Sequence, residues 1–206
     1  MLFRRREMAS LRLHKTSSNE TEKEVIGIRE VPSHEPLAEL IADITKRPII
    51  PSSGALETLH IGREDLPWME GGDGSALQLL HVDLNIGLWI SKTRLPAGYR
   101  VATHYHTGLV FAVTLEGSWF YLESPDAVNS PGSYLFEPAG SRHTLVTPSA
   151  QKGNTVTWFA IYGANINLDP EGNVTSVLDA KAVLDLYRSY CAALNLDASN
   201  LIVMGE

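Results

Sequence analysis

The sequence is poor in cysteine, in basic residues and in long apolar runs. Cys191 is its single cysteine among 206 residues, so no disulfide can form within the chain, and nothing points to an oxidising compartment. No apolar run approaches the roughly 18 residues needed to cross a bilayer. Only 17 Lys and Arg residues face 24 Asp and Glu residues, a net charge of −7 that argues against nucleic-acid binding. We expect a cytoplasmic protein that acts neither on nucleic acid nor at a membrane.

The composition that remains is that of a globular protein with an N-terminal appendage. Hydrophobic residues make up 44% and charged residues 20%, near the averages for folded domains. Residues 1–24 are basic and then polar, which is typical of a flexible tail. Residues 35–46 carry Leu and Ile at helical spacing after Pro36, which predicts a short amphipathic helix. We therefore divide the chain into an extension, residues 1–55, and a single domain, residues 56–206.

The domain itself is dominated by short apolar segments rich in β-branched and aromatic residues. Turns rich in glycine and proline separate these segments, a pattern that predicts an all-β sandwich or barrel. The segments are residues 76–82, 84–95, 109–115, 118–122, 133–136, 144–147 and 155–163.

The C-terminal part has the pattern of a helix. Val183, Tyr187, Tyr190 and Leu194 recur at helical spacing, and residues 176–179 have the form of a capping box that would start the helix. Cys191 falls on the apolar side, and no basic residue is placed to stabilise its thiolate. We expect Cys191 to be a buried structural thiol.

Three histidines form the candidate metal site. His104 and His106 are spaced H-x-H in a segment of β character, so both imidazoles can face the same side of a strand. His143 stands at the start of another strand-like segment. Three imidazoles that converge from neighbouring strands would make a metal site with open positions, and imidazole suits Fe, Zn, Cu and Ni.

The glycines and the proline around these histidines carry a family resemblance. Gly98 precedes His104 with five residues between them, and the second spacing, G-x5-P-x-G-x2-H, is formed by Gly132, Pro138, Gly140 and His143. Both patterns resemble the two motifs of the cupin superfamily. The resemblance implies a double-stranded β-helix, that is, a jelly-roll barrel with the metal inside. It also implies a homodimer or homotetramer.

The sequence departs from the cupin pattern at two positions. The first motif usually supplies a glutamate four or five residues after its second histidine, where this chain has Val110 and Phe111. Thr147 replaces the asparagine that often ends the second motif. Three neutral imidazoles leave the double positive charge of the metal uncompensated, which favours an anionic bidentate ligand such as an enolate.

The resemblance extends to cupin dioxygenases with three histidine ligands. Acetylacetone dioxygenase is of this type, and the 2,4'-dihydroxyacetophenone dioxygenase group is similar over roughly residues 58–165, notably at 66–68, 107–108, 115–119 and 137–145. This implies a non-haem Fe(II) enzyme that uses O2 to cleave a carbon–carbon bond of a β-diketone or an aromatic α-hydroxyketone. His104, His106 and His143 would be its metal ligands and catalytic centre. Zn(II) or Ni(II) would be alternative metals in the purified protein.

Two other functions fit the same motifs. One is a zinc-binding regulatory cupin of the anti-sigma-factor type, although the N-terminal segment lacks a zinc-binding cluster of cysteines and histidines. The other is a metal-dependent isomerase or hydrolase, which would work without O2.

The substrate pocket and the remaining polar residues are assigned by their place on the predicted strands. Core packing is the default for the aromatic side chains, and we expect one or two of them to line the pocket: Trp119, Tyr121, Phe136 and Trp158. Glu116 and Glu137 stand against turns and are interpreted as structural. Arg142 is expected to face away from His143. The other four histidines lack any ligand spacing and are interpreted as surface or structural residues: His14, His34, His60 and His81.

Overall fold

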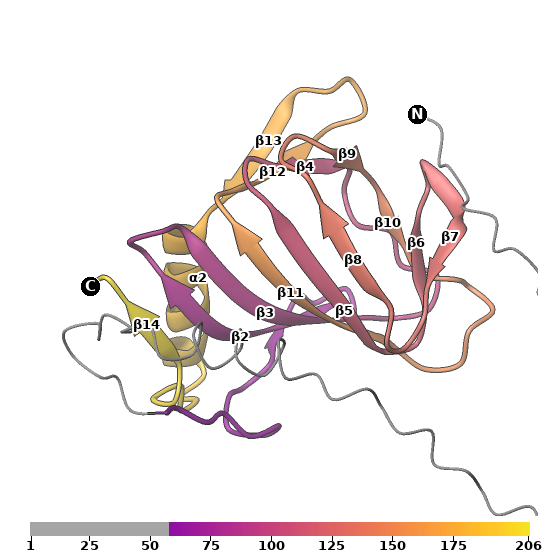
Figure 1. Ribbon diagram of the computed structural model, residues 1–206. Coiled ribbons are helices and arrows are strands. Elements are labelled where there is room, and N and C mark those ends of the chain that lie inside the picture. The colour runs from indigo at the N-terminus through magenta and orange to yellow at the C-terminus, as the bar shows by residue number, and fades with distance from the viewer. Residues whose placement is uncertain (1–57) are drawn as a thin grey trace, which may run out of the picture. The chain divides into compact units, whose positions relative to one another are not determined.

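The computed structural model describes residues 58–206. The predicted helix at 35–46 and the rest of the extension lie outside the described residues. Within the described part the protein is mostly β-strand with one helix (Figure 1), which confirms the all-β prediction. No helix in this part is long and apolar enough to span a bilayer.

The largest sheet has seven strands. Figure 1 shows its central strands side by side, and antiparallel pairing gives the order β1-β2-β3-β11-β5-β8, with β14 pairing in parallel to β2. Buried and half-buried residues alternate along much of its length, as in a sheet with one face on the core. The strands are β1 (Met69–Glu70), β2 (Ala76–Asp83), β3 (Leu88–Leu95), β5 (Val110–Glu116), β8 (Tyr134–Glu137), β11 (Thr155–Tyr162) and β14 (Ile202–Met204).

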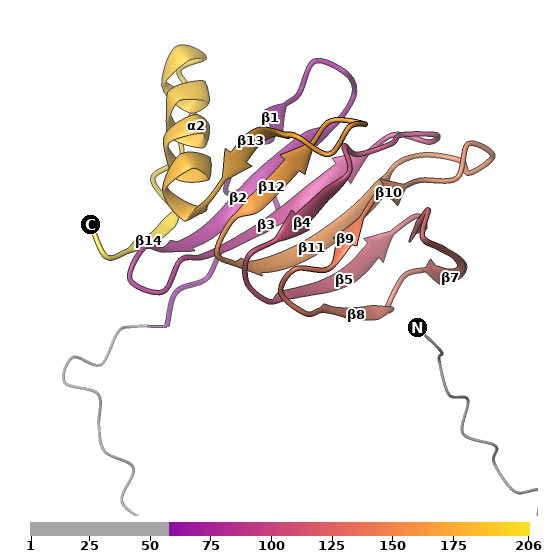
Figure 2. The ribbon, with the colours of Figure 1, turned by 90° about the horizontal axis from the view of Figure 1, so that it is seen from above.

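Two smaller sheets complete the sandwich. One has the order β10-β6-β7, formed by Leu145–Val146, Trp119–Tyr121 and Ser124–Asn129. The other has the order β13-β12-β4-β9, formed by Val174–Leu178, Asn165–Leu168, His104–His106 and Arg142–His143. Figure 2 shows this four-stranded sheet lying across β2, β3 and β11 of the large sheet.

The apolar core lies between the sheets. Leu79, Val82, Val110 and Trp119 are fully buried there. The indole N–H of Trp119 donates to Oγ1 of Thr114 at 2.9 Å, so the one polar atom of this buried ring is paired. This hydrogen bond joins β6 to β5 inside the core.

Helix α2 (Ala180–Ala193) is the predicted C-terminal helix, and it packs against β2. Its buried face includes Val183, Tyr187 and Cys191. Burial raises the pKa of the Cys191 thiol, as expected for a structural cysteine. The predicted start is wrong: Asp179 caps the helix by accepting from the Ala182 N–H at 2.8 Å. The residues before Asp179 are strand β13 instead, because their backbone pairs with β12.

Candidate metal centre

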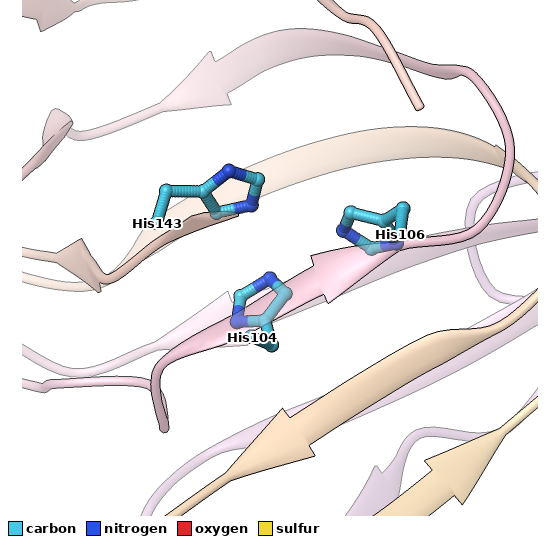
Figure 3. Close-up of side chains that lie close together, drawn as sticks. All are labelled: His104, His106 and His143. Atoms are coloured by element: carbon cyan, nitrogen blue, oxygen red, sulfur yellow. The ribbon is translucent and has the colours of Figure 1, made fainter. Parts of the chain in front are cut away.

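Strands β4 and β9 bring the three predicted histidines together. His104 and His143 are directly paired across these strands, and His106 lies two residues along β4 on the same face. All three are buried, and one ligand nitrogen from each lies within 4.8 Å of the others. Figure 3 shows the imidazole rings close together over the two strands.

The turn between β8 and β9 holds this arrangement in place. Gly140 adopts a φ of +80°, a conformation that a residue with a Cβ rarely takes, and its N–H donates to the His106 carbonyl at 2.8 Å. Ser141 N–H donates back to the Pro138 carbonyl at 3.2 Å. The P-x-G spacing of the sequence motif is thus the turn that returns the chain beside β4.

The histidines have the protonation state that metal binding needs. Burial, reinforced by the neighbouring imidazoles, lowers the pKa of His106 and of His143 to about 3, and burial also lowers the pKa of His104. The rings are therefore neutral near pH 7, and a neutral imidazole is the form that binds metal. Nδ1 of His104 lies 2.7 Å from the Ala102 carbonyl, which orients the ring with Nε2 free.

Unpaired buried atoms in the cluster show that the residues fit a metal ion. Nδ1 of His106 and Nε2 of His143 have no hydrogen-bond partner among the described residues. Buried polar atoms are nearly always paired, so such a group of orphans calls for an explanation. A cation held at the Nε2 atoms of these rings would satisfy Nε2 of His143, and Nδ1 of His106 would stay unpaired.

Glu137 also belongs to this site, which sequence reasoning missed. It ends β8, is 3% exposed, and accepts a hydrogen bond from the Tyr121 hydroxyl at Oε1. Its Oε2 has no hydrogen-bond partner and lies 3.5 Å from Nε2 of His106 and 3.4 Å from Nε2 of His143. The purely structural role assigned to Glu137 is therefore corrected.

Glu137 also changes the expectation of a site with histidines alone. Two ligands held about 2.1 Å from one tetrahedral ion lie about 3.4 Å apart, which is the separation of Oε2 from the two Nε2 atoms. Glu137 pairs in register with Val110, one of the two positions where the usual motif glutamate is missing. A carboxylate thus reaches the cluster from the neighbouring strand. Burial raises the pKa of Glu137 to about 7, because the buried carboxylate loses its hydration. A bound cation would compensate the charge of that carboxylate.

A cavity of about 410 Å³ opens from the cluster between the large and the four-stranded sheets. His104, His106, Tyr121 and Glu137 are among its polar lining residues. The large sheet contributes mainly apolar side chains to its wall, including Leu77, Trp89, Leu95, Phe159 and Ile161. The volume, and the combination of an apolar wall with polar side chains, are those of a small-molecule site.

Of the aromatic side chains predicted to line the pocket, only the one whose strand face turns toward the cavity does so. Tyr121 lines the cavity and stacks on His143 with ring centroids 4.1 Å apart. Trp119 lies in the core, edge-on to Tyr121, and does not line the cavity. Phe136 and Trp158 are corrected: Phe136 is 51% exposed, and Trp158 alternates with Phe159, which points inward.

The other polar residues considered in the sequence lie away from the cluster. Glu116 is half-exposed and forms an ion pair with Arg63 at 3.5 Å. Arg142 is exposed while His143 is buried, which agrees with the expected opposite facing. His60 is exposed and His81 is half-buried on β2, and neither joins the three ligand histidines.

A β-sandwich with three buried histidines on its inner strands defines the cupin class, and the comparisons with known proteins agree. The family model of the ChrR Cupin-like domain matches residues 57–164, so the chain belongs to this cupin family. No curated protein matches the chain.

Solved cupin structures support the fold. An RmlC-like cupin from Ralstonia eutropha JMP134 is 30% identical, with 69% of this chain and 92% of that chain covered and a TM-score of 0.65. A protein of unknown function with a cupin-like fold, from the same organism, is 26% identical over 74% and 96% of the two chains, with a TM-score of 0.67. An acetylacetone dioxygenase from Acinetobacter johnsonii is 20% identical over 70% and 99%, with a TM-score of 0.58, and at that identity shows the fold alone.

Proposed function

We propose that the protein is a metal-dependent cupin dioxygenase that cleaves a carbon–carbon bond of a β-diketone or an aromatic α-hydroxyketone. The observation that carries the proposal is the buried histidine cluster on the lining of a cavity of about 410 Å³ that has an apolar wall. A metal site that serves only structure has no use for such a cavity, whereas an enzyme needs it to hold a substrate beside the metal.

His104, His106 and His143 would hold the metal, with Glu137 at its side. Iron(II) is the proposed ion, because it would supply a Lewis acid and a template for a ketone and dioxygen together. Zinc or nickel would occupy the same ligands in purified protein. The imidazoles bring no charge, so Glu137 is the one anion in contact with this cluster among the described residues.

The charges of the site favour an enolate. A divalent cation beside one carboxylate and three neutral rings leaves a single positive charge, which an enolate would neutralise. Tyr121 holds Oε1 of Glu137, so Oε2 stays directed at the histidines. The apolar wall formed by Trp89, Phe159 and Ile161 would exclude water and strengthen these electrostatic interactions.

Oxygen consumption tests the proposal directly. The protein would be reconstituted with Fe(II), and O2 uptake followed on a panel of diketones and α-hydroxyacetophenones, with metal content measured in parallel. We expect uptake on at least one ketone, its loss in His104→Ala, and its retention in the control His60→Ala, whose histidine is exposed. Full activity of His104→Ala would overturn the assignment.

A zinc-binding regulatory cupin is the second candidate. The position of Oε2 of Glu137 favours it, because three histidines and one carboxylate make a complete tetrahedral zinc set. This candidate predicts stoichiometric zinc and no O2 uptake with any ketone. Turnover of a ketone without O2 would instead indicate a metal-dependent isomerase or hydrolase.

A further inference from the structure

Asn165 lies on the cavity wall beside the metal ligands. Its strand, β12, pairs with β4 on the side away from β9 (Figure 2), and Asn165 is directly opposite His106 in the register. Directly opposed residues of an antiparallel pair share a face, and their Cβ atoms are about 5 Å apart. Asn165 therefore faces the cavity that it lines, within reach of a molecule bound next to His106.

The side-chain amide of Asn165 has one end bound and one end free. Its Nδ2 donates to Oδ1 of Asn167 at 3.0 Å, and Nδ2 of Asn167 donates onward to Oγ of Ser176 at 2.9 Å. Oδ1 of Asn165 accepts no hydrogen bond from the described residues and is not a buried atom. An amide oxygen can accept two hydrogen bonds. The chain of amides thus orients Asn165 and leaves an accessible acceptor on the half-buried side chain.

Other polar side chains around the cavity are engaged elsewhere or lie on the other wall. Tyr121 donates to Glu137, and Tyr99 donates to Oδ2 of Asp73 at 2.7 Å. Thr93 also lines the cavity, but it belongs to β3 of the large sheet. Asn165 carries its unused acceptor on the same sheet as the ligand histidines.

We propose that Asn165 is a positioning residue whose Oδ1 accepts a hydrogen bond from a donor on the molecule bound at the metal. The inference rests on the metal site of the proposed function and adds a second point of contact, on β12. Asn165 would recognise an N–H or O–H group that comes within about 3 Å of Oδ1. Contacts at both the metal and Asn165 define one orientation of the bound molecule, whereas the metal alone allows several.

Two hydroxamates that differ in a single donor test this role without turnover. Acetohydroxamate chelates a metal through two oxygens and carries an N–H, whereas N-methylacetohydroxamate chelates in the same way without an N–H. Isothermal titration calorimetry on the full-length, zinc-loaded protein would give the ratio of their dissociation constants, with zinc content measured for each variant. We expect a preference for acetohydroxamate that falls about tenfold in Asn165→Leu, the effect of one hydrogen bond.

Further variants distinguish a lost hydrogen bond from a general disturbance of the site, which would weaken both hydroxamates and leave their ratio unchanged. Asn165→Asp keeps an acceptor oxygen, and its added charge weakens both anions alike, so the preference should survive. Asn165→Ala replaces Asn165→Leu if that variant fails to fold. Asn154→Leu is the matched control, because Asn154 is exposed and does not line the cavity, and it should keep the wild-type ratio.

The outcomes separate this inference from the proposed dioxygenase. An unchanged ratio in Asn165→Leu, or no binding of either hydroxamate to the zinc-loaded wild type, would overturn the role of Asn165. A ratio that depends on Asn165, without O2 uptake by the iron-loaded protein on any ketone, would support this role and defeat the dioxygenase. O2 uptake with an unchanged ratio would defeat the role of Asn165 and leave the dioxygenase standing.

Discussion

The large sheet and the four-stranded sheet differ in length and in the kind of side chain they present. Strands β2, β3 and β11 each have eight residues and present mainly apolar side chains inward, whereas β4 has three residues and β9 has two. The short strands nevertheless carry all three ligand histidines. The difference teaches that the large sheet supplies most of the buried apolar surface, whereas the four-stranded sheet supplies the three histidines, which turns and strand pairing hold in place rather than strand length.

Removal of a ligand from the short strands is expected to have the largest effect. His143→Ala leaves two imidazoles, so metal content after dialysis should fall from about one ion per chain to near background. Arg142→Ala is the matched control, because its side chain is exposed on the same strand. Elemental analysis would measure both, and circular dichroism would confirm that both are folded. Full metal retention in His143→Ala would contradict the site.

A large-to-small substitution in the core of the large sheet should instead lower stability and leave the metal content unchanged. Leu79 is fully buried on β2, so Leu79→Ala should lower the free energy of unfolding by about 2–5 kcal/mol. Leu115→Ala on β5, at a side chain 42% exposed, should cost under about 1 kcal/mol. Urea denaturation would give both values. Metal content should stay unchanged in both variants, and its loss in Leu79→Ala would show that the two walls are not separable.

Glu137 links the two walls, and its effect should depend on pH. Burial raises its pKa from 4.5 to about 7, so the metal-free folded state holds this proton more tightly than the unfolded chain. The stability from this proton is present below pH 4.5 and is lost as pH rises through about 7. Glu137→Gln keeps an acceptor for Tyr121 without the charge. In metal-free protein its stability relative to wild type should rise between pH 5 and pH 8, by up to roughly 3 kcal/mol.

Urea denaturation at several pH values would measure this difference with and without metal. In metal-loaded protein the cation compensates the carboxylate, so the advantage of Glu137→Gln at pH 8 should disappear or reverse. A stability difference that does not change with pH in the metal-free protein would mean that the Glu137 carboxylate is not destabilised by its burial.

The sequence predicted the large sheet and the ligands better than it predicted the wall of the cavity. The H-x-H spacing sufficed for His104 and His106 because alternate residues of any strand share a face. Glu137 was missed because its role depends on which face of β8 turns inward and on its pairing with Val110. Phe136 was assigned to the pocket for the same reason, since residue type alone does not fix the face of a strand.

A substitution on the outer face of the large sheet should have the smallest effect of all, and a matched one on its inner face provides the contrast. Phe136 on β8 is 51% exposed and lies tilted against Phe111 with ring centroids 5.7 Å apart, whereas Phe159 on β11 is 8% exposed and lines the cavity. Phe136→Ala should change the free energy of unfolding by no more than about 1 kcal/mol and leave the affinity for ketones unchanged, because it removes only a surface contact. Phe159→Ala should cost about 3–5 kcal/mol and weaken ketone binding, because it removes part of the apolar wall of the cavity. Calorimetric titration would measure the ketone affinity of both variants. Weaker binding in Phe136→Ala would place the ligand on the outer face of the large sheet and contradict a site on its inner face.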